Sequence, residues 1–289
     1  MKLALHLNNY AGLGSPADMS GALARVARRA EDAGFARLSV TDHVWQISLL
    51  GEEDSPMLEA YTLLGYFAGL TRRLELQTLV TAATYRAPGL LGKILTTLDV
   101  VSGGRAWLGI GAGWNEQEAT GLGLPYDGQG GRFERLEEAI RICLQMWSGS
   151  REEFRGTHYL LSSTLNVPEP VSSPRPRILI GGGGERVTLR LAARYADAFN
   201  VYGGRDAGQK IARLREHCEQ IGRDHTEIER TAFLPVDLDA PGGVDAVVGE
   251  LRRLHELGFT TVYAAVEGVG TLTPLEIIGH KVIPEIAHW

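Results

Sequence analysis

The chain has 289 residues, a formal net charge of −6 and only two cysteines, Cys143 and Cys218. This length is typical of one (β/α)8 barrel and can bury a sizeable core. Mild acidity with scattered basic residues argues against nucleic-acid binding, and two cysteines in apolar helical patterns argue against a disulfide framework or a cysteine-rich metal site.

The first half of the chain alternates strand patterns with helical patterns. Its first residues run into an apolar strand without a signal peptide, and no apolar run is long enough to span a bilayer. We therefore expect a soluble cytoplasmic enzyme without a membrane partner.

A loop over 44–56 has the length of many lids and binding loops. Strands are predicted at 2–8, 35–41, 74–83 and 106–110, and helices at 16–34, 57–70, 89–101 and 133–146.

The segment 148–175 breaks the alternation, with a proline-rich stretch and a hairpin pattern over 153–161. We interpret it as an insertion after the fourth helix, because the alternation resumes directly after it. Eight strands alternating with eight helices predict an α/β fold, a TIM barrel, as a single domain over 1–289. The remaining strands are predicted at 177–180, 197–202, 228–236 and 260–265, and the helices at 185–195, 207–222, 244–257 and 274–286.

Polar residues and glycines cluster directly after the predicted strands, whereas the first residues of the strands form no such cluster. Because barrel enzymes carry their active sites at the C-terminal strand ends, this asymmetry indicates a functional face. His43 follows a strand beside Asp42 and is a candidate general acid, general base or ligand-binding group. The alternative is that Asp42 caps a turn and His43 only satisfies a loop carbonyl.

Two glycine-rich segments are candidate ligand sites. Backbone N–H groups at a helix start bind anions, so we interpret the segment before the predicted helix over 185–195 as a phosphate site, the alternative being a flexible barrel turn. The run from Gly109 to Gly113 is not followed by a helix, so a dinucleotide fingerprint is rejected. No metal-ligand spacing or serine-nucleophile motif is present, and no metal is expected. The glycines of the first segment are Gly181, Gly182, Gly183 and Gly184.

The joint order of several segments resembles the bacterial luciferase-like superfamily of flavin and deazaflavin oxidoreductases, and within it the coenzyme F420-dependent class. The resemblance covers about Leu3 to Arg230. Its segments are Thr41-Asp42-His43, Leu79-Val80-Thr81, Thr84-Tyr85-Arg86-Ala87-Pro88, Ser102-Gly103-Gly104-Arg105, Gly109 to Glu116, Arg132 to Glu138, Ile180 to Gly184 and Ala193 to Asp197.

The resemblance implies a TIM barrel with the cofactor ring over the barrel mouth and the cofactor phosphate near the fifth strand. It implies a cis peptide between Leu79 and Val80, with Val80 against the ring, and His43 as the catalytic residue. It also implies a homodimer. The cofactor is F420, or alternatively FMN. The implied cofactor-binding residues are Asp42, Leu79, Val80, Ala112, Gly113, Gly181, Gly182, Gly183 and Gly184.

One position departs from the family pattern. The sugar-phosphate dehydrogenases of the family carry a catalytic glutamate where this chain has Trp114, and Glu116 stands two positions on. The departure argues against a sugar-phosphate substrate and leaves the proton donor unassigned. The loops 44–56 and 114–131 and the insertion would shape a pocket for a small-molecule substrate. Its candidate residues are Asn8, Trp45, Tyr85, Trp114 and Glu116.

Three functions follow from the resemblance. The leading hypothesis is an F420-dependent oxidoreductase that transfers a hydride between the deazaflavin ring and a small organic substrate. The second is an FMN-dependent monooxygenase that uses reduced flavin and oxygen. The third is a barrel that binds a flavin without turnover.

Overall fold

The computed structural model describes residues 1–48 and 50–289; Leu49, within the predicted loop 44–56, lies outside the described residues. In the described chain nine strands form one sheet, in the order β3-β2-β1-β11-β10-β9-β8-β5-β4. The bounds are β1 (Lys2–Leu7), β2 (Arg37–Val40), β3 (Glu75–Thr78), β4 (Thr81–Ala82), β5 (Ala106–Gly111), β8 (Arg177–Gly181), β9 (Ala198–Tyr202), β10 (Glu229–Val236) and β11 (Thr261–Val266).

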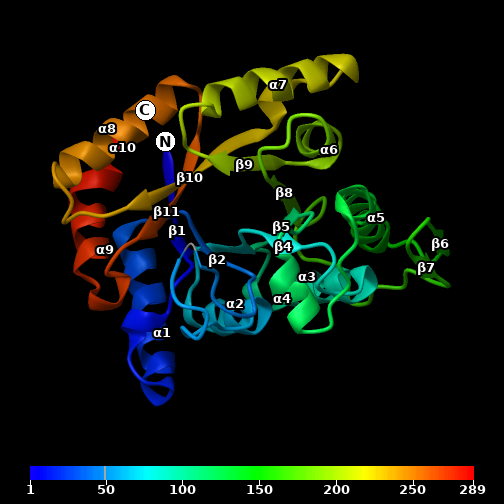
Figure 1. Cartoon of the computed structure of the whole chain (residues 1–289), viewed down its shortest axis with the longest axis horizontal. Helices are drawn as coiled ribbons and strands as arrows, with labels where there is room; N and C mark the ends of the chain where they lie inside the picture. The colour runs from blue at the N-terminus through cyan, green and yellow to red at the C-terminus, as the bar shows by residue number, and fades with distance from the viewer. Residues whose placement is uncertain (49) are drawn as a thin grey trace.

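The sheet closes on itself. All its pairings are parallel; β1 pairs with β11, where Lys2 lies opposite Thr261, and β3 pairs with β5, where Leu76 lies opposite Ala106. Because β3 and β4 are two parts of one barrel strand, the closed sheet has eight strands, and helices surround it (Figure 1). The predicted TIM barrel is confirmed.

The helices include most of those predicted. A short additional helix, α4, lies between β5 and α5, where the sequence analysis expected only a loop. The closing helix over 274–286 is instead α9 and α10, joined by a π-helical turn over 278–282. The bounds are α1 (Pro16–Ala33), α2 (Ala60–Leu70), α3 (Pro88–Ser102), α4 (Glu116–Gly121), α5 (Gln129–Trp147), α6 (Thr188–Tyr195), α7 (Ala207–Gln220), α8 (Gly243–Glu256), α9 (Thr273–Ile277) and α10 (Ile283–Ile286).

Two helix starts differ from the prediction, each for a local reason. Helix α2 begins at Ala60 rather than residue 57, because the Glu59 carboxylate caps it and accepts from the Thr62 N–H at 2.6 Å. Helix α5 begins at Gln129, four residues before the apolar periodicity starts. The predicted loop 114–131 is therefore shorter than expected.

The third barrel strand is divided between β3 and β4, and the Leu79–Val80 peptide bond between the two parts is cis. This agrees with what the family resemblance implies. The division places Leu79 and Val80 at the wall of the barrel, where they pack on its interior side chains.

The barrel has two apolar layers because successive strand residues point to opposite faces. On β1, Leu3, Leu5 and Leu7 face the surrounding helices and join the large core between strands and helices. Ala4 faces the barrel axis, where it belongs to a small interior cluster with Trp107 and Tyr263. His6 shares the parity of Ala4, so it too faces the axis.

An ion network closes the N-terminal end of the barrel. Arg37 opens β2, is fully buried, and lies 4.0 Å above the Trp107 ring. Its guanidinium pairs with Glu75 at the start of β3 and, at 2.7 Å, with Glu229 at the start of β10. Burial works against charge here, but Tyr263 and the two carboxylates together outweigh it and raise the pKa of Arg37. This end of the barrel is thus a packed floor.

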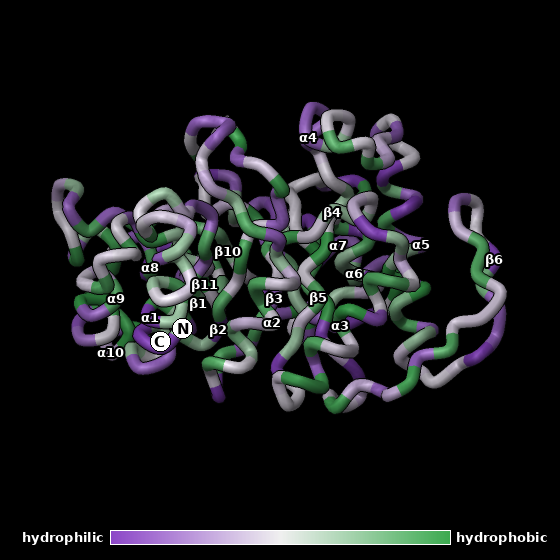
Figure 2. The backbone as a smooth tube through the Cα atoms, turned by 90° about the horizontal axis from the view of Figure 1, so that it is seen from below, coloured by the Kyte–Doolittle hydropathy of each residue, from purple (hydrophilic) through white to green (hydrophobic). Residues whose placement is uncertain are grey.

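Helix α4 and the long loops lie at the opposite end of the barrel, where the strands have their C-terminal ends. In Figure 2, α4 and neighbouring loops project at one end of the barrel, and the two termini lie toward the other. The N-terminal amine donates to the Ile286 carbonyl at 2.7 Å. The hairpin predicted over 153–161 is present as antiparallel β6 (Phe154–Arg155) and β7 (Leu160–Leu161), outside the barrel sheet. Among the described residues, no helix is both long and apolar enough to cross a bilayer.

Candidate active site

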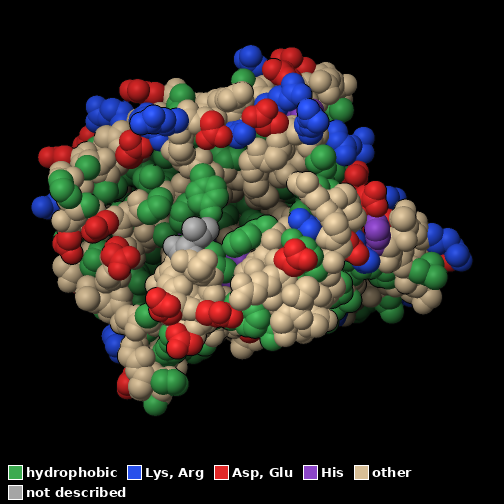
Figure 3. Space-filling model, viewed as in Figure 1, with side chains coloured by type: hydrophobic (Ala, Val, Ile, Leu, Met, Phe, Trp, Pro, Cys, Tyr) green, Lys and Arg blue, Asp and Glu red, His purple; other side chains and the backbone are tan. Residues whose placement is uncertain are grey.

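A cavity of about 700 Å³ opens at the C-terminal ends of the strands. Figure 3 shows a hollow near the centre of this face with hydrophobic side chains along it. The cavity is lined by residues that follow or end most of the barrel strands, which is where barrel enzymes place their chemistry. Its formally charged lining side chains are Asp42 and Arg132, and two histidines, His6 and His43, also reach it.

His43 is held by a buried carboxylate. Its Nδ1 lies 2.6 Å from Oε2 of Glu118, whose side chain is fully buried. The Tyr85 hydroxyl donates to the same oxygen at 2.6 Å, and the Val44 N–H donates to Oε1. Burial opposes ionisation of Glu118, but these hydrogen bonds outweigh it and lower the pKa of its carboxyl.

The ionised carboxylate decides the tautomer of His43. An ionised carboxylate only accepts hydrogen bonds, so Nδ1 of His43 carries the donated proton. Nε2 is left without a hydrogen-bond partner among the described residues, on a ring that lines the cavity. Trp114 meets this ring edge-on, with centroids 5.5 Å apart. The histidine therefore presents one free nitrogen to the cavity.

Helix α4 delivers Glu118. Asn115 is its N-cap, and the Asn115 side chain accepts from the Glu118 N–H at 3.3 Å. The spacing Asn-x-x-Glu is that of a capping box, in which the glutamate ordinarily turns back to its own cap. Here it reaches the strand ends that carry His43 and Tyr85 instead. Sequence reasoning missed this residue, although the capping pattern directly after a barrel strand was a usable signal.

Asp42 is engaged in an ion pair. Its carboxylate accepts from Arg86 at 2.6 and 3.0 Å and from the Thr81 hydroxyl. Burial raises the pKa of Asp42, although Arg86 works in the opposite direction. Asp42 lines the cavity, but its carboxylate oxygens already accept hydrogen bonds from Arg86 and Thr81. In this structure it fixes the strand end beside His43.

Val80 explains two of the glycines at the strand ends. A Cβ on Gly181 would lie 2.8 Å from Val80 Cγ1, and one on Gly111 would lie 2.9 Å from Cγ2. Both distances are too short for real side chains, so β5 and β8 can present only backbone here. Val80 occupies that space and lines the cavity between the two strands.

The glycine loop, residues 181–184, does not lead directly into a helix as predicted. Helix α6 begins at Thr188, four residues after Gly184. Glu185 is held by α7 instead: its carboxylate pairs with Lys210 at 2.8 Å, and its carbonyl accepts from His217 at 2.7 Å. The predicted helix start at residue 185 is therefore wrong, whereas the phosphate site at the glycines stays a prediction.

Other donors nevertheless surround this loop. The N–H groups of Gly183 and Gly184 have no acceptor among the described residues. A Cβ on Gly184 would lie 2.7 Å from the Thr188 hydroxyl oxygen, and one on Gly183 would lie 3.6 Å from Cε of Lys210. Two free N–H groups and one hydroxyl thus gather at one end of the cavity, with the paired ammonium group of Lys210 beside them.

The structure brings most predicted site residues to one place. The predicted residues that line the cavity are Asn8, Asp42, His43, Leu79, Val80, Tyr85, Ala112, Gly113, Trp114, Gly181, Gly182, Gly183 and Gly184. Two do not. Trp45 packs against Gly121 of α4, where a Cβ would lie 2.2 Å from its ring, and Glu116 is exposed on α4. The acid that reaches the site from this helix is Glu118.

His6 was missed by sequence reasoning. Its Nδ1 lies 2.9 Å from the Ser39 hydroxyl oxygen, and that hydroxyl donates to the Leu5 carbonyl at 3.3 Å. His6 therefore donates from Nδ1 and keeps a lone pair on Nε2. Burial lowers its pKa to about 3, so the ring is neutral near pH 7. The sequence does contain a usable signal: residues 4, 6 and 8 alternate along β1 and its C-terminal end, so His6 points to the same side of the strand as Ala4 and Asn8.

The chain is similar in sequence to proteins of a known family. The luciferase-like monooxygenase family model matches residues 5–242. An F420-dependent glucose-6-phosphate dehydrogenase of Kineococcus radiotolerans is 32% identical over 226 residues, 76% of this chain and 64% of that protein. A pyrimidine monooxygenase of Enterobacter cloacae is 28% identical over 176 residues, 58% of this chain and 47% of that protein. The chain thus spans less than two thirds of the length of either curated relative.

A solved structure shows the same fold. An F420-dependent secondary alcohol dehydrogenase in complex with an F420-acetone adduct superposes with a TM-score of 0.81, covering 98% of each chain at 18% identity. At that identity the likeness concerns the fold alone.

Proposed function

Because this chain belongs to the luciferase-like monooxygenase family, we propose that it is a coenzyme F420-dependent oxidoreductase. It would transfer a hydride between the deazaflavin ring and a small organic substrate. The observation that carries the proposal is that one cavity contains His43 with a free nitrogen, the Leu79–Val80 segment and the glycine loop. The F420-dependent dehydrogenase among the relatives supports the choice of cofactor.

The residues around the cavity fit such a cofactor. Val80, Ala112 and Gly113 offer a small, largely backbone surface on which a flat ring can lie. The glycine loop, with Thr188 and Lys210, offers donors that suit the cofactor phosphate. These are the groups that would hold F420 in this chain.

His43 is the residue that would move a proton. F420 supplies a two-electron hydride donor or acceptor when it is bound. For oxidation of an alcohol, Nε2 of His43 takes the proton of the substrate hydroxyl as the hydride leaves its carbon. For the reverse reaction, the protonated ring returns it. The carboxylate of Glu118 holds the ring in the required tautomer and stabilises the positive charge that develops on it.

Titration of the purified apoprotein with F420 and, separately, with FMN tests the cofactor. We expect saturable binding of F420, measured by its fluorescence, and weaker binding of FMN. Tight FMN binding without F420 binding would overturn the proposal. It would favour an FMN-dependent monooxygenase instead, in line with the monooxygenase relative.

A histidine replacement separates catalysis from mere binding. His43→Ala should keep the affinity for F420 and lose F420 reduction by secondary alcohols. His158→Ala is the matched control, because His158 pairs with Glu134 at 2.7 Å and lies outside the cavity. Equal rates in both variants and the parent protein would remove His43 from the chemistry, and F420 binding without turnover of any alcohol would favour a non-catalytic barrel.

Two further expectations belong to the same proposal. The family resemblance implies a homodimer, and the sequence pattern implies a cytoplasmic protein. Light scattering on the purified chain checks the first, and fractionation of the cells that produce it checks the second.

A further inference from the structure

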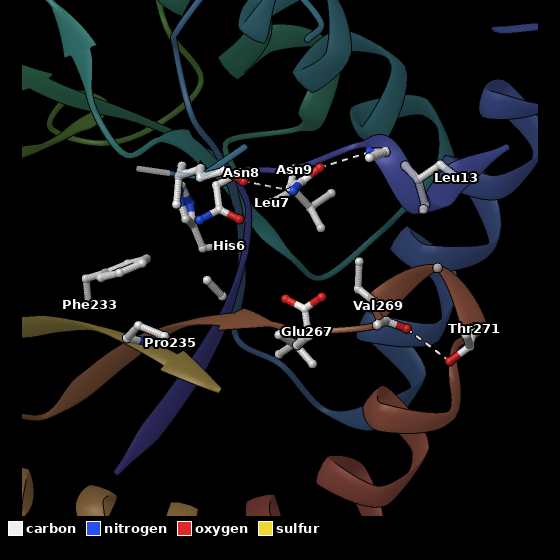
Figure 4. Close-up of a pocket in the computed structure, with 17 residues that line it drawn as sticks. His6, Leu7, Asn8, Asn9, Leu13, Phe233, Pro235, Glu267, Val269 and Thr271 are labelled. Atoms are coloured by element: carbon white, nitrogen blue, oxygen red, sulfur yellow. Dashed lines mark hydrogen bonds between the residues drawn. The ribbon is translucent and has the colours of Figure 1, made fainter. Parts of the chain in front are cut away.

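A smaller cavity of about 350 Å³ adjoins the large one at the barrel mouth. It is walled by the end of β1, the end of β10 and the loop after β11, as Figure 4 shows. The two cavities are contiguous, because they share lining residues. The shared residues are His6, Asn8, Leu50, Phe233 and Pro235.

The polar groups of this cavity are mainly hydrogen-bond acceptors. The neutral His6 ring carries its proton on Nδ1, which leaves Nε2 as an acceptor. The Asn8 side chain has no hydrogen-bond partner among the described residues, so its amide is free to accept and to donate. The Glu267 carboxylate points into the cavity in Figure 4; this residue is also exposed to solvent, and it has no ion-pair partner in the described chain. The remaining lining is mostly apolar.

The charges at the two ends of the combined cavity are opposite. No lysine or arginine lines the smaller cavity, and its one formally charged side chain is Glu267. At the far end of the large cavity, Arg132 belongs to the lining, and the N–H groups of Gly183 and Gly184 have no acceptor among the described residues. Lys210 adjoins Gly183 but is paired with Glu185 and Asp206. A phosphate is therefore attracted to the glycine-loop end and repelled from the Glu267 end.

We propose that the smaller cavity is a substrate subsite for a neutral or cationic group rich in hydrogen-bond donors, such as a hydroxyl or an ammonium group. The inference rests on the proposed function for its place in a reaction: the reacting carbon lies beside His43 and the distal end of the substrate lies against Glu267. Anionic substrates are disfavoured there. Glu267 is thus a specificity-determining residue.

Three probes of matched shape test the subsite. They are cyclohexanol, trans-4-aminocyclohexanol and trans-4-hydroxycyclohexanecarboxylate, which share a ring and differ in charge. Dissociation constants come from saturation-transfer NMR titrations, with and without F420. We expect the amine to bind roughly tenfold more tightly than the carboxylate. Equal affinity of these two, or no saturable binding of the amine, would overturn the proposal.

Substitutions of Glu267 test whether this residue causes the preference for the amine over the carboxylate. Glu267→Gln should bring the amine and carboxylate affinities within about threefold of one another, and Glu267→Lys should favour the carboxylate. Glu250→Gln is the control: it removes the same charge from an exposed site on α8, where Glu250 pairs with Arg253. An unchanged ratio in Glu267→Gln would contradict the proposal, as would an equal change in Glu250→Gln.

The same titrations separate this inference from the proposed function. If F420 fails to bind while the amine preference and its dependence on Glu267 persist, the cofactor proposal fails and the subsite stands. If F420 binds and no charge preference is found, the subsite alone is wrong.

Discussion

Nδ1 of His43 and Oε2 of Glu118 lie 2.6 Å apart, although the two residues are 75 positions apart in the chain. One follows β2 and the other lies on the short helix after β5. The contact connects a cavity-lining imidazole to a fully buried carboxylate. It gives the imidazole a fixed orientation and a fixed tautomer, as the aspartate of a hydrolase triad does.

Glu118→Gln should change the tautomer of His43. The neutral amide no longer requires a proton on Nδ1, so the ring should populate the form protonated on Nε2. Nitrogen-15 NMR of the histidine side chains measures this directly, with the His43 signals assigned through His43→Ala. Glu116→Gln, on the exposed side of the same helix, should leave the spectrum of His43 unchanged. A parent-like tautomer in Glu118→Gln would show that the carboxylate does not control the ring.

Gly183→Asp should weaken binding of F420. The new carboxylate would lie near Lys210, which Glu185 and Asp206 already pair, and would repel the cofactor phosphate. We expect the dissociation constant for F420 to rise roughly tenfold or more. Gly249→Asp adds the same charge to α8, where nothing lies within 4 Å of the new Cβ. Unaltered affinity in Gly183→Asp would exclude the glycine loop from the phosphate site.

Arg37→Met should destabilise the barrel floor. The substitution leaves Glu75 and Glu229 facing one another without their shared cation. Breaking a buried ion pair in this way costs about 3–5 kcal/mol of unfolding free energy. Urea unfolding measures the free energy of unfolding of Arg37→Met and of the control Arg29→Ala. Arg29 is a suitable control because it forms an exposed ion pair, with Glu276. The control should lose less than about 1 kcal/mol, and similar losses in both variants would argue against the floor network.

His6→Asn should reduce the dependence of stability on pH. The pKa of His6 is lowered from 6.5 to about 3 on folding, so between these values the unfolded chain binds the extra proton. Stability is therefore fully present above pH 6.5 and falls as the pH is lowered toward 3, by at most about 1.4 kcal/mol per pH unit for one group. Asparagine does not titrate. The difference between parent and variant unfolding free energies should thus change between pH 7 and pH 5, and parallel curves would contradict a neutral buried His6.

Much of the site was readable from the sequence because it follows local rules. The ends of β2, β5 and β8 carry His43, Ala112 and Gly181, and a barrel places all strand ends on one face. The start of α6 was misjudged for a non-local reason. Glu185 binds Lys210 and His217 on α7, contacts that no pattern within residues 181–195 encodes.

The sequence by itself determined the barrel, its family and the face that carries the site, because apolar periodicity, glycine spacing and segment order are properties of neighbouring residues. Only the tertiary structure decided that Glu118 rather than Glu116 reaches His43, that Trp45 packs on α4, and that His6 is neutral and faces the cavity. Each of these depends on which side chains the closed barrel brings together and how far it removes them from water. Periodicity in the sequence contains neither distance nor burial.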